Sequence, residues 1–172
     1  VMTLPTAVQI IAENNYGRPN EAYDLLKKVN KTFGYALPGS MYEVSPDYGM
    51  MTQAWNVYAY GEPIVKQFFG IRPYAFNKQV IISPQLPAAL THGSIEHVVI
   101  GDNQVSVLFK QEKNSIDFTI NQNANDWNIL FQQPKGKFKK WELNGKLIKP
   151  IIVGNMEQIV ISAKKAKILV SN

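Results

Sequence analysis

The period of the hydrophobic residues changes near Phe76, and this change constrains the fold more than any other feature of the 172-residue sequence. Before this point apolar residues recur at helical spacing, as they do in residues 4–12. After it they alternate with polar residues in short runs, which is typical of half-buried strands. The sequence therefore predicts an α+β chain with a helical domain over residues 1–76 and a strand domain over residues 77–172.

Three helices are expected in the helical domain. Residues 4–12 and 21–33 each place apolar side chains on one face, and residues 34–48 form a long loop rich in glycine, proline and serine. A third helix is expected from about Met50 to Phe69, with apolar or aromatic side chains nearly all round. Such a helix is normally buried among other helices. Because two amphipathic helices cannot cover it, we expect it to have an uncovered face.

The strand domain contains short alternating runs at about ten-residue spacing, separated by Gly-Asp-Asn, Asn-Gly and Gly-Asn turns. This arrangement predicts an antiparallel β-sandwich, with Trp127 and Trp141 in its core. The expected strands are residues 79–83, 95–100, 104–109, 115–120, 128–131, 137–143, 147–148, 158–161 and 167–170.

The composition excludes several classes of site. With 45% hydrophobic and 18% charged residues the chain is predicted to be ordered and globular. It has no cysteine and only two histidines, so we expect no disulfide, no cysteine nucleophile and no metal site. No glycine-rich nucleotide motif is present, and no cofactor is expected. No apolar run approaches the roughly 18 residues of a membrane span, so no membrane partner is expected either.

The net charge of +5 raises the possibility of nucleic-acid binding. Lysines at 137, 139 and 140 lie beside Phe138 and Trp141, which forms a basic stripe with aromatic neighbours. Arginine, which leads in phosphate recognition, is almost missing from the strand domain. We therefore interpret the stripe as a solvated face and expect no nucleic-acid partner.

The loop before the third expected helix carries two carboxylates among aromatic residues. Glu43 and Asp47 lie between Tyr42 and Tyr48. Aromatic rings pack on the C–H faces of sugars, and a positioned carboxylate can take a proton from a water that attacks the anomeric carbon. In the alternative interpretation, Glu43 accepts hydrogen bonds from loop amides and Asp47 caps the following helix.

The segment from Met2 to Pro87 contains a series of short motifs, in the order Asn14–Ala22, Pro38–Glu43, Asp47–Gly49, Gln53–Asn56, Phe69–Pro73 and Ile82–Pro87. By these motifs the segment resembles the C-terminal end of bacterial six-hairpin glycosidases. These are (α/α)-barrel hydrolases of the glycogen-debranching or amylo-α-1,6-glucosidase-like type, related to α-L-rhamnosidases. The last motif is similar to the link by which such enzymes enter a C-terminal β-sandwich.

The resemblance implies that the chain holds the last helices of an incomplete barrel and an accessory sandwich. Its partners would be a carbohydrate substrate and the upstream part of the same barrel. Glu43 would be the general base of an inverting mechanism and Asp47 the reserve candidate, while Tyr42, Tyr48 and Trp55 would bind substrate. Inversion needs two carboxyl groups roughly 6.5 to 9.5 Å apart. Because no partner acid is identified, we expect the isolated chain to be inactive. The alternative is a non-catalytic carbohydrate-binding or interaction module.

Overall fold

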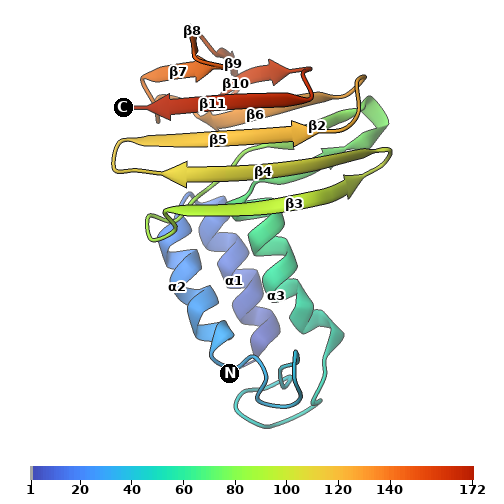
Figure 1. Cartoon of the computed structure of the whole chain (residues 1–172). Coiled ribbons are helices and arrows are strands. Elements are labelled where there is room, and N and C mark those ends of the chain that lie inside the picture. The colour runs from blue at the N-terminus through green and yellow to red at the C-terminus, as the bar shows by residue number, and fades with distance from the viewer. Residues whose placement is uncertain (1) are drawn as a thin grey trace. The chain divides into compact units, whose positions relative to one another are not determined.

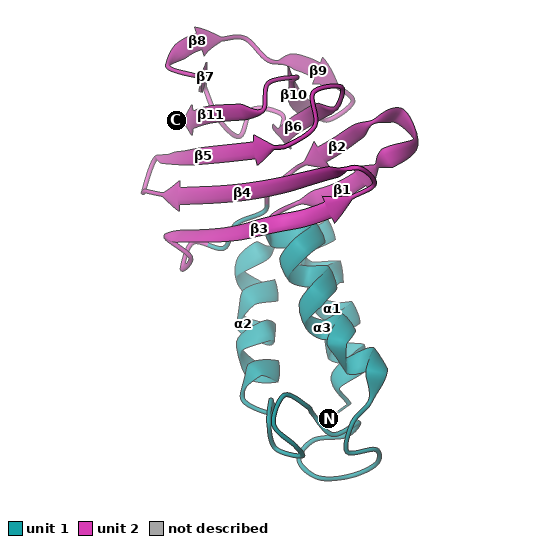
Figure 2. Cartoon of the chain, turned by 45° about the vertical axis from the view of Figure 1, so that its right-hand side comes forward, with its two compact units in different colours: residues 1–68, 85–87 teal, residues 69–84, 88–172 magenta. Residues whose placement is uncertain are grey.

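The computed structural model describes residues 2–172 and contains helices in its first part and two β-sheets in its second (Figure 1). The chain divides into two compact units, coloured separately in Figure 2. Unit 1 comprises residues 1–68 and 85–87, and unit 2 comprises residues 69–84 and 88–172. The α+β class with a sandwich, predicted from the sequence, is confirmed.

Unit 1 begins with a helical hairpin made of α1 (Thr3–Asn15) and α2 (Pro19–Asn30). Gly17 has a φ of +74°, which a residue without a Cβ adopts without strain, and Pro19 occupies the first turn of α2. The two helices bury one face each, together with side chains from the loop and the third helical segment. This core contains Ala7, Ile10, Ala22, Leu26, Val29, Met41, Ala59 and Phe68.

The third helical segment is shorter and less regular than the sequence predicts. It consists of a 3₁₀ turn η1 (Ala54–Val57), one α-turn α3 (Tyr58–Gly61) and a π-helical stretch η2 (Glu62–Phe68). The expected start at Met50 is wrong, because the backbone of Met50 is hydrogen-bonded to Glu43. Pro63 lacks an N–H and its ring clashes with the carbonyl four residues earlier, which accounts for the wider turn of η2.

Unit 2 contains two sheets. The five-stranded sheet has the order β1 (Ile71–Tyr74), β2 (Gln79–Ile82), β6 (Asn128–Pro134), β10 (Met156–Ile161) and β9 (Ile151–Val153), with the short 3₁₀ turn η3 (Ala75–Asn77) between β1 and β2. The six-stranded sheet has the order β3 (His92–Ile100), β4 (Asn103–Gln111), β5 (Ser115–Gln122), β11 (Lys165–Ser171), β7 (Lys140–Leu143) and β8 (Lys146–Ile148).

The observed sheets differ from the predicted ones in two respects. Strands β1 and β9 were not predicted, because Pro73 interrupts one pattern and residues 151–153 show no alternation. Both are edge strands, where proline is tolerated. In addition, β2 pairs with β6 in parallel, so the sandwich is not wholly antiparallel. The chain between these two strands passes through the six-stranded sheet, and a parallel pair requires such a long crossover.

The core of unit 2 is rich in aromatic side chains. The rings of Phe118 and Phe131 lie 5.0 Å apart, and those of Phe131 and Trp141 lie 6.0 Å apart. Trp127 is buried as well, and its indole N–H donates to Asp102 at 2.8 Å. The predicted core positions of Trp127 and Trp141 are therefore confirmed. Among the helices of residues 2–172, none is both long enough and apolar enough to cross a membrane.

Candidate functional site

The loop that carries the candidate carboxylates is an ordered hairpin within unit 1. Val44 and Tyr48 exchange two backbone hydrogen bonds, each 3.0 Å long. One step further out, the Glu43 N–H donates to the Met50 carbonyl at 2.9 Å. The turn between them contains Asp47, which is exposed at its tip. The loop therefore presents Glu43 at the base of a hairpin and Asp47 at its end.

The carboxylate of Glu43 is held by the same hairpin. Its Oε2 accepts a hydrogen bond from the Met50 N–H at 3.3 Å, and the side chain is half-buried. Gly49 has a φ of +79°, and a Cβ at this position would lie 2.7 Å from Glu43 Oε2. Gly49 therefore provides both the turn and the space that the carboxylate occupies.

Two neighbouring elements hold the chain on the other side of Glu43. The Asn56 side-chain N–H groups donate to the carbonyl of Tyr42 at 3.1 Å and to that of Met41 at 3.3 Å. The backbone N–H of Thr3, at the start of α1, donates to the Glu43 carbonyl at 3.3 Å. Every carbonyl from residue 41 to residue 43 therefore has a donor from a helical segment.

The other residues expected at the site lie in different surroundings. Tyr42 is half-buried beside Glu43, whereas the ring of Tyr48 is 75% exposed at the hairpin. Trp55 belongs to η1 and is 61% exposed. Asp47 is not a helix cap, because the next helical segment begins only at Ala54. The structure thus places four of the five residues on one loop and the fifth on the next element.

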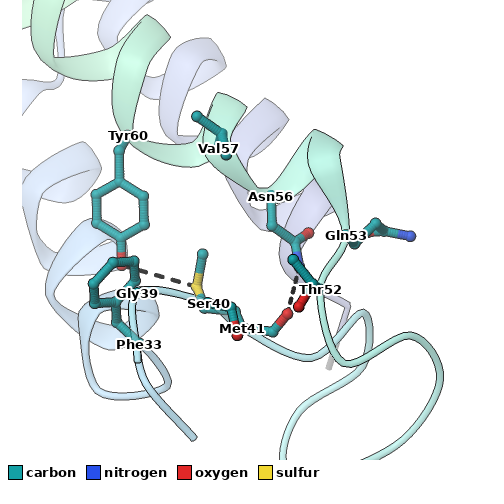
Figure 3. A pocket seen from close by; sticks show the side chains of 9 residues that line it. All are labelled: Phe33, Gly39, Ser40, Met41, Thr52, Gln53, Asn56, Val57 and Tyr60. Carbon is teal, nitrogen blue, oxygen red and sulfur yellow. Dashed lines mark hydrogen bonds between the residues drawn. The ribbon is translucent and has the colours of Figure 1, made fainter. Parts of the chain in front are cut away.

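An apolar pocket of about 280 Å³ lies beside this loop within unit 1 (Figure 3). At one end the rings of Phe33 and Tyr60 meet edge to face at 5.3 Å, and the Tyr60 hydroxyl donates to the Met41 sulfur at 3.9 Å. Burial raises the pKa of the Tyr60 hydroxyl above its ordinary value. The pocket is lined by Phe33, Gly39, Ser40, Met41, Thr52, Gln53, Asn56, Val57 and Tyr60, and Glu43 is not among them.

Three residues of this region were not predicted as functional candidates: Gly49, Asn56 and Tyr60. Asn56 carries a sequence signal, since its neighbours in residues 54–60 are all apolar or aromatic. Gly49 does not, because its closeness to Glu43 depends on the hairpin register. The ring contact of Tyr60 with Phe33 joins residues 27 positions apart, which no local pattern shows.

The basic stripe of unit 2 has partners within its own chain. Lys137 donates to Gln133 at 3.2 Å and lies over the ring of Phe138 at 5.3 Å. Lys140 is paired with Glu142 at 2.6 Å. Within the part of the chain that the structure describes, no group of three or more acidic or histidine side chains could hold a metal ion.

Comparison with known proteins finds similarity at the level of structure. No family model and no curated protein sequence matches the chain. The solved structure of an α-L-rhamnosidase from Dictyoglumus thermophilum matches 93% of this chain with a TM-score of 0.64 and 13% identity. The α-L-rhamnosidase of Streptomyces avermitilis, solved in complex with L-rhamnose, matches 96% with a TM-score of 0.62 and 16% identity.

These matches cover a small part of the solved proteins. The chain spans 20% of the Dictyoglumus thermophilum protein and 17% of the Streptomyces avermitilis protein. At this sequence identity the comparison establishes the fold. The chain therefore has a glycoside hydrolase-related fold, similar to one segment of these two α-L-rhamnosidases.

Proposed function

We propose that this chain is the C-terminal part of a glycoside hydrolase that cleaves O-glycosidic bonds of an oligo- or polysaccharide. The observation that carries the proposal is the match of 93% and 96% of the chain to segments of two α-L-rhamnosidases. The same chain presents a half-buried glutamate on an ordered loop of its helical unit. The rest of the barrel would come from the upstream part of the same protein.

Glu43 is the proposed general base of an inverting mechanism. In such a mechanism one carboxylate takes a proton from water while a carboxylic acid on the opposite side of the sugar protonates the leaving oxygen. The hydrogen bond from the Met50 N–H orients the Glu43 carboxylate within the hairpin. The acid would be supplied by an earlier loop of the barrel. Asp47, exposed at the hairpin tip, is the reserve candidate for the base.

The proposed sugar contacts come from the aromatic residues around the hairpin. Tyr48 and Trp55 expose their rings, so a sugar face can pack on them without any rearrangement of the core. Tyr42 is half-buried directly before Glu43 and would contribute to the sugar-binding surface next to the base. No cofactor enters this mechanism, because two carboxyl groups and water suffice for glycoside hydrolysis.

Of the two glycosidase types named in the sequence resemblance, the α-L-rhamnosidase type is our first choice of substrate class. The two solved structures compared above are α-L-rhamnosidases, and one was solved with L-rhamnose. A glycogen-debranching activity is supported only by the sequence resemblance. A panel of aryl glycosides that includes α-L-rhamnoside and α-glucoside separates the two substrate types.

The test is Glu43→Gln in a polypeptide that contains this chain together with the upstream helices of its barrel. Loss of a general base typically slows a reaction about 10²- to 10⁴-fold. We therefore expect kcat for the preferred aryl glycoside to fall by at least about 10²-fold. Glu21→Gln, on the exposed start of α2, is the matched control and should leave kcat unchanged. Full activity of the Glu43→Gln protein would overturn the assignment of the base.

The second candidate function is a non-catalytic carbohydrate-binding module. One observation favours it: the Glu43 carboxylate is hydrogen-bonded to its own loop and does not line the neighbouring pocket. This function predicts that the chain retains glycans without cleaving them. Binding of a glycan to the chain, together with no hydrolysis by the longer polypeptide, would support it over the enzyme.

A further inference from the structure

Asn56 is a buried residue whose side-chain amide forms hydrogen bonds through its nitrogen but not through its oxygen. Its side chain is 2% exposed, and both of its hydrogen bonds are donated from Nδ2 to the carbonyls of Met41 and Tyr42. Within residues 2–172 its Oδ1 has no hydrogen-bond partner, although it is shielded from solvent. A buried acceptor without a partner destabilises the folded chain. The contribution of Asn56 therefore comes from its donors and from the loop that they hold.

The carbonyls that Asn56 binds belong to the two residues directly before Glu43. The Thr3 hydroxyl also reaches the Tyr42 carbonyl, but at 3.5 Å, which is at the limit of a hydrogen bond, whereas Asn56 binds it at 3.1 Å. Glu43 itself is hydrogen-bonded to the backbone of Met50 in the same hairpin and to the backbone N–H of Thr3. Asn56 is thus the main side-chain link between the loop and the third helical segment.

We propose that Asn56 is a positioning residue for Glu43. The proposal rests on the proposed role of Glu43 as a base, and adds to it the residue that sets the direction of its side chain. Fixing the carbonyls of residues 41 and 42 fixes the peptide planes before Glu43, and with them the direction of its Cα–Cβ bond. Misplacement of a catalytic group by about 1 Å can reduce a rate about 10²-fold.

The wild-type chain gives the first test, because the proposal requires a specific state of the Asn56 side chain. Its NH₂ protons and the backbone N–H of Met50 should exchange with solvent more slowly than the NH₂ protons of Asn15, an exposed asparagine at the end of α1. NMR exchange measurements on the 172-residue chain provide these rates. Exchange of the Asn56 NH₂ protons as fast as those of Asn15 would overturn the proposal.

The second test removes the donor. In Asn56→Ala we expect faster exchange at Met50 and a fall in kcat of about 10²-fold in the longer polypeptide, with KM changed less than about threefold. Asn56→Ser, whose hydroxyl can make one donor bond, should recover part of kcat. Asn14→Ala is the matched control: Asn14 is a buried amide of α1 outside the pocket, its Nδ2 donates to the Ile10 carbonyl at 3.2 Å, and its Oδ1 has no partner among the described residues.

The outcomes separate positioning from simple loss of stability. If Asn14→Ala and Asn56→Ala lower the melting temperature alike but only Asn56→Ala lowers kcat, the positioning role is supported. Equal loss of kcat in both variants, or unchanged kcat in Asn56→Ala, would contradict it. If the wild-type polypeptide cleaves no glycoside, the proposed function fails, and the exchange rates still decide whether Asn56 holds the Glu43 loop.

Discussion

At the scale of single residues, the site depends on backbone contacts that a sequence pattern does not show. Glu43 is a candidate from the sequence, because it is a carboxylate between aromatic residues in a long loop. Its hydrogen bond to Met50 could not be predicted, since that bond depends on the register of the hairpin. The same register places Gly49 against the carboxylate and makes the start of the third helix later than predicted.

Gly49→Ala is predicted to move the Glu43 carboxylate. An alanine at a φ of +79° costs about 1 to 2 kcal/mol, and its methyl group would also meet Glu43 Oε2 at 2.7 Å. Gly17→Ala is the matched control, because Gly17 has a φ of +74° and open space around its Cβ position. Both variants should lose similar stability in urea unfolding, but only Gly49→Ala should speed hydrogen exchange at the Met50 amide. Equal exchange rates at the Met50 amide in both variants would show that the methyl group at position 49 does not displace the Glu43 carboxylate.

At the scale of helices and strands, the periodic segments were predicted well, whereas β1 and β9, the two edge strands of the five-stranded sheet, were not predicted. Strands β4, β5 and β11 alternate in burial along most of their length, so each appears in the sequence as a period of two. Strand β9 is exposed at all three positions and has no such signal. The parallel pairing of β2 with β6 is a non-local property, because strands of the other sheet lie between them in the chain.

The end of the sandwich near β4, β5 and β6 is held by a buried polar network. Asn103 donates to Gln122 at 3.0 Å and accepts from the Ala124 N–H at 3.2 Å. Gln122 in turn donates to the carbonyls of Trp127 and Ala163 at 3.1 and 3.2 Å. These bonds join β5 to the segments that precede β6 and β11. A network with all its members paired is stabilising, and the loss of one member leaves the others buried without partners.

Asn103→Ala is therefore predicted to destabilise unit 2 by about 1 to 3 kcal/mol, because it leaves the Gln122 Oε1 and the Ala124 N–H without their partner. Urea unfolding followed by tryptophan fluorescence measures this, since Trp127 and Trp141 are both buried in this unit. Gln104→Ala, at the neighbouring exposed position, should change the free energy of unfolding by less than about 0.5 kcal/mol. A similarly small change in the free energy of unfolding for Asn103→Ala would contradict this prediction. It would show that water can take the place of Asn103 in these hydrogen bonds.

At the scale of the whole chain, unit 1 leaves many large apolar side chains exposed. In the loop and η1, Met50, Met51 and Val57 are 59%, 56% and 70% exposed. The sequence predicted an uncovered face here, because two amphipathic helices are too few to bury a third apolar helix. Soluble monomers rarely expose large contiguous apolar patches, so this surface is expected to be covered in the working protein. The proposed cover is the upstream part of the same barrel.

The measurement that tests this account most directly is the mass of the purified 172-residue chain by light scattering over a range of concentrations, with binding of an apolar dye. We predict dye binding and a mass that rises above 19.4 kDa with concentration, because the exposed face of unit 1 associates when nothing covers it. A stable 19.4 kDa monomer at every concentration, with no dye binding, would contradict the account and favour an independent carbohydrate-binding module.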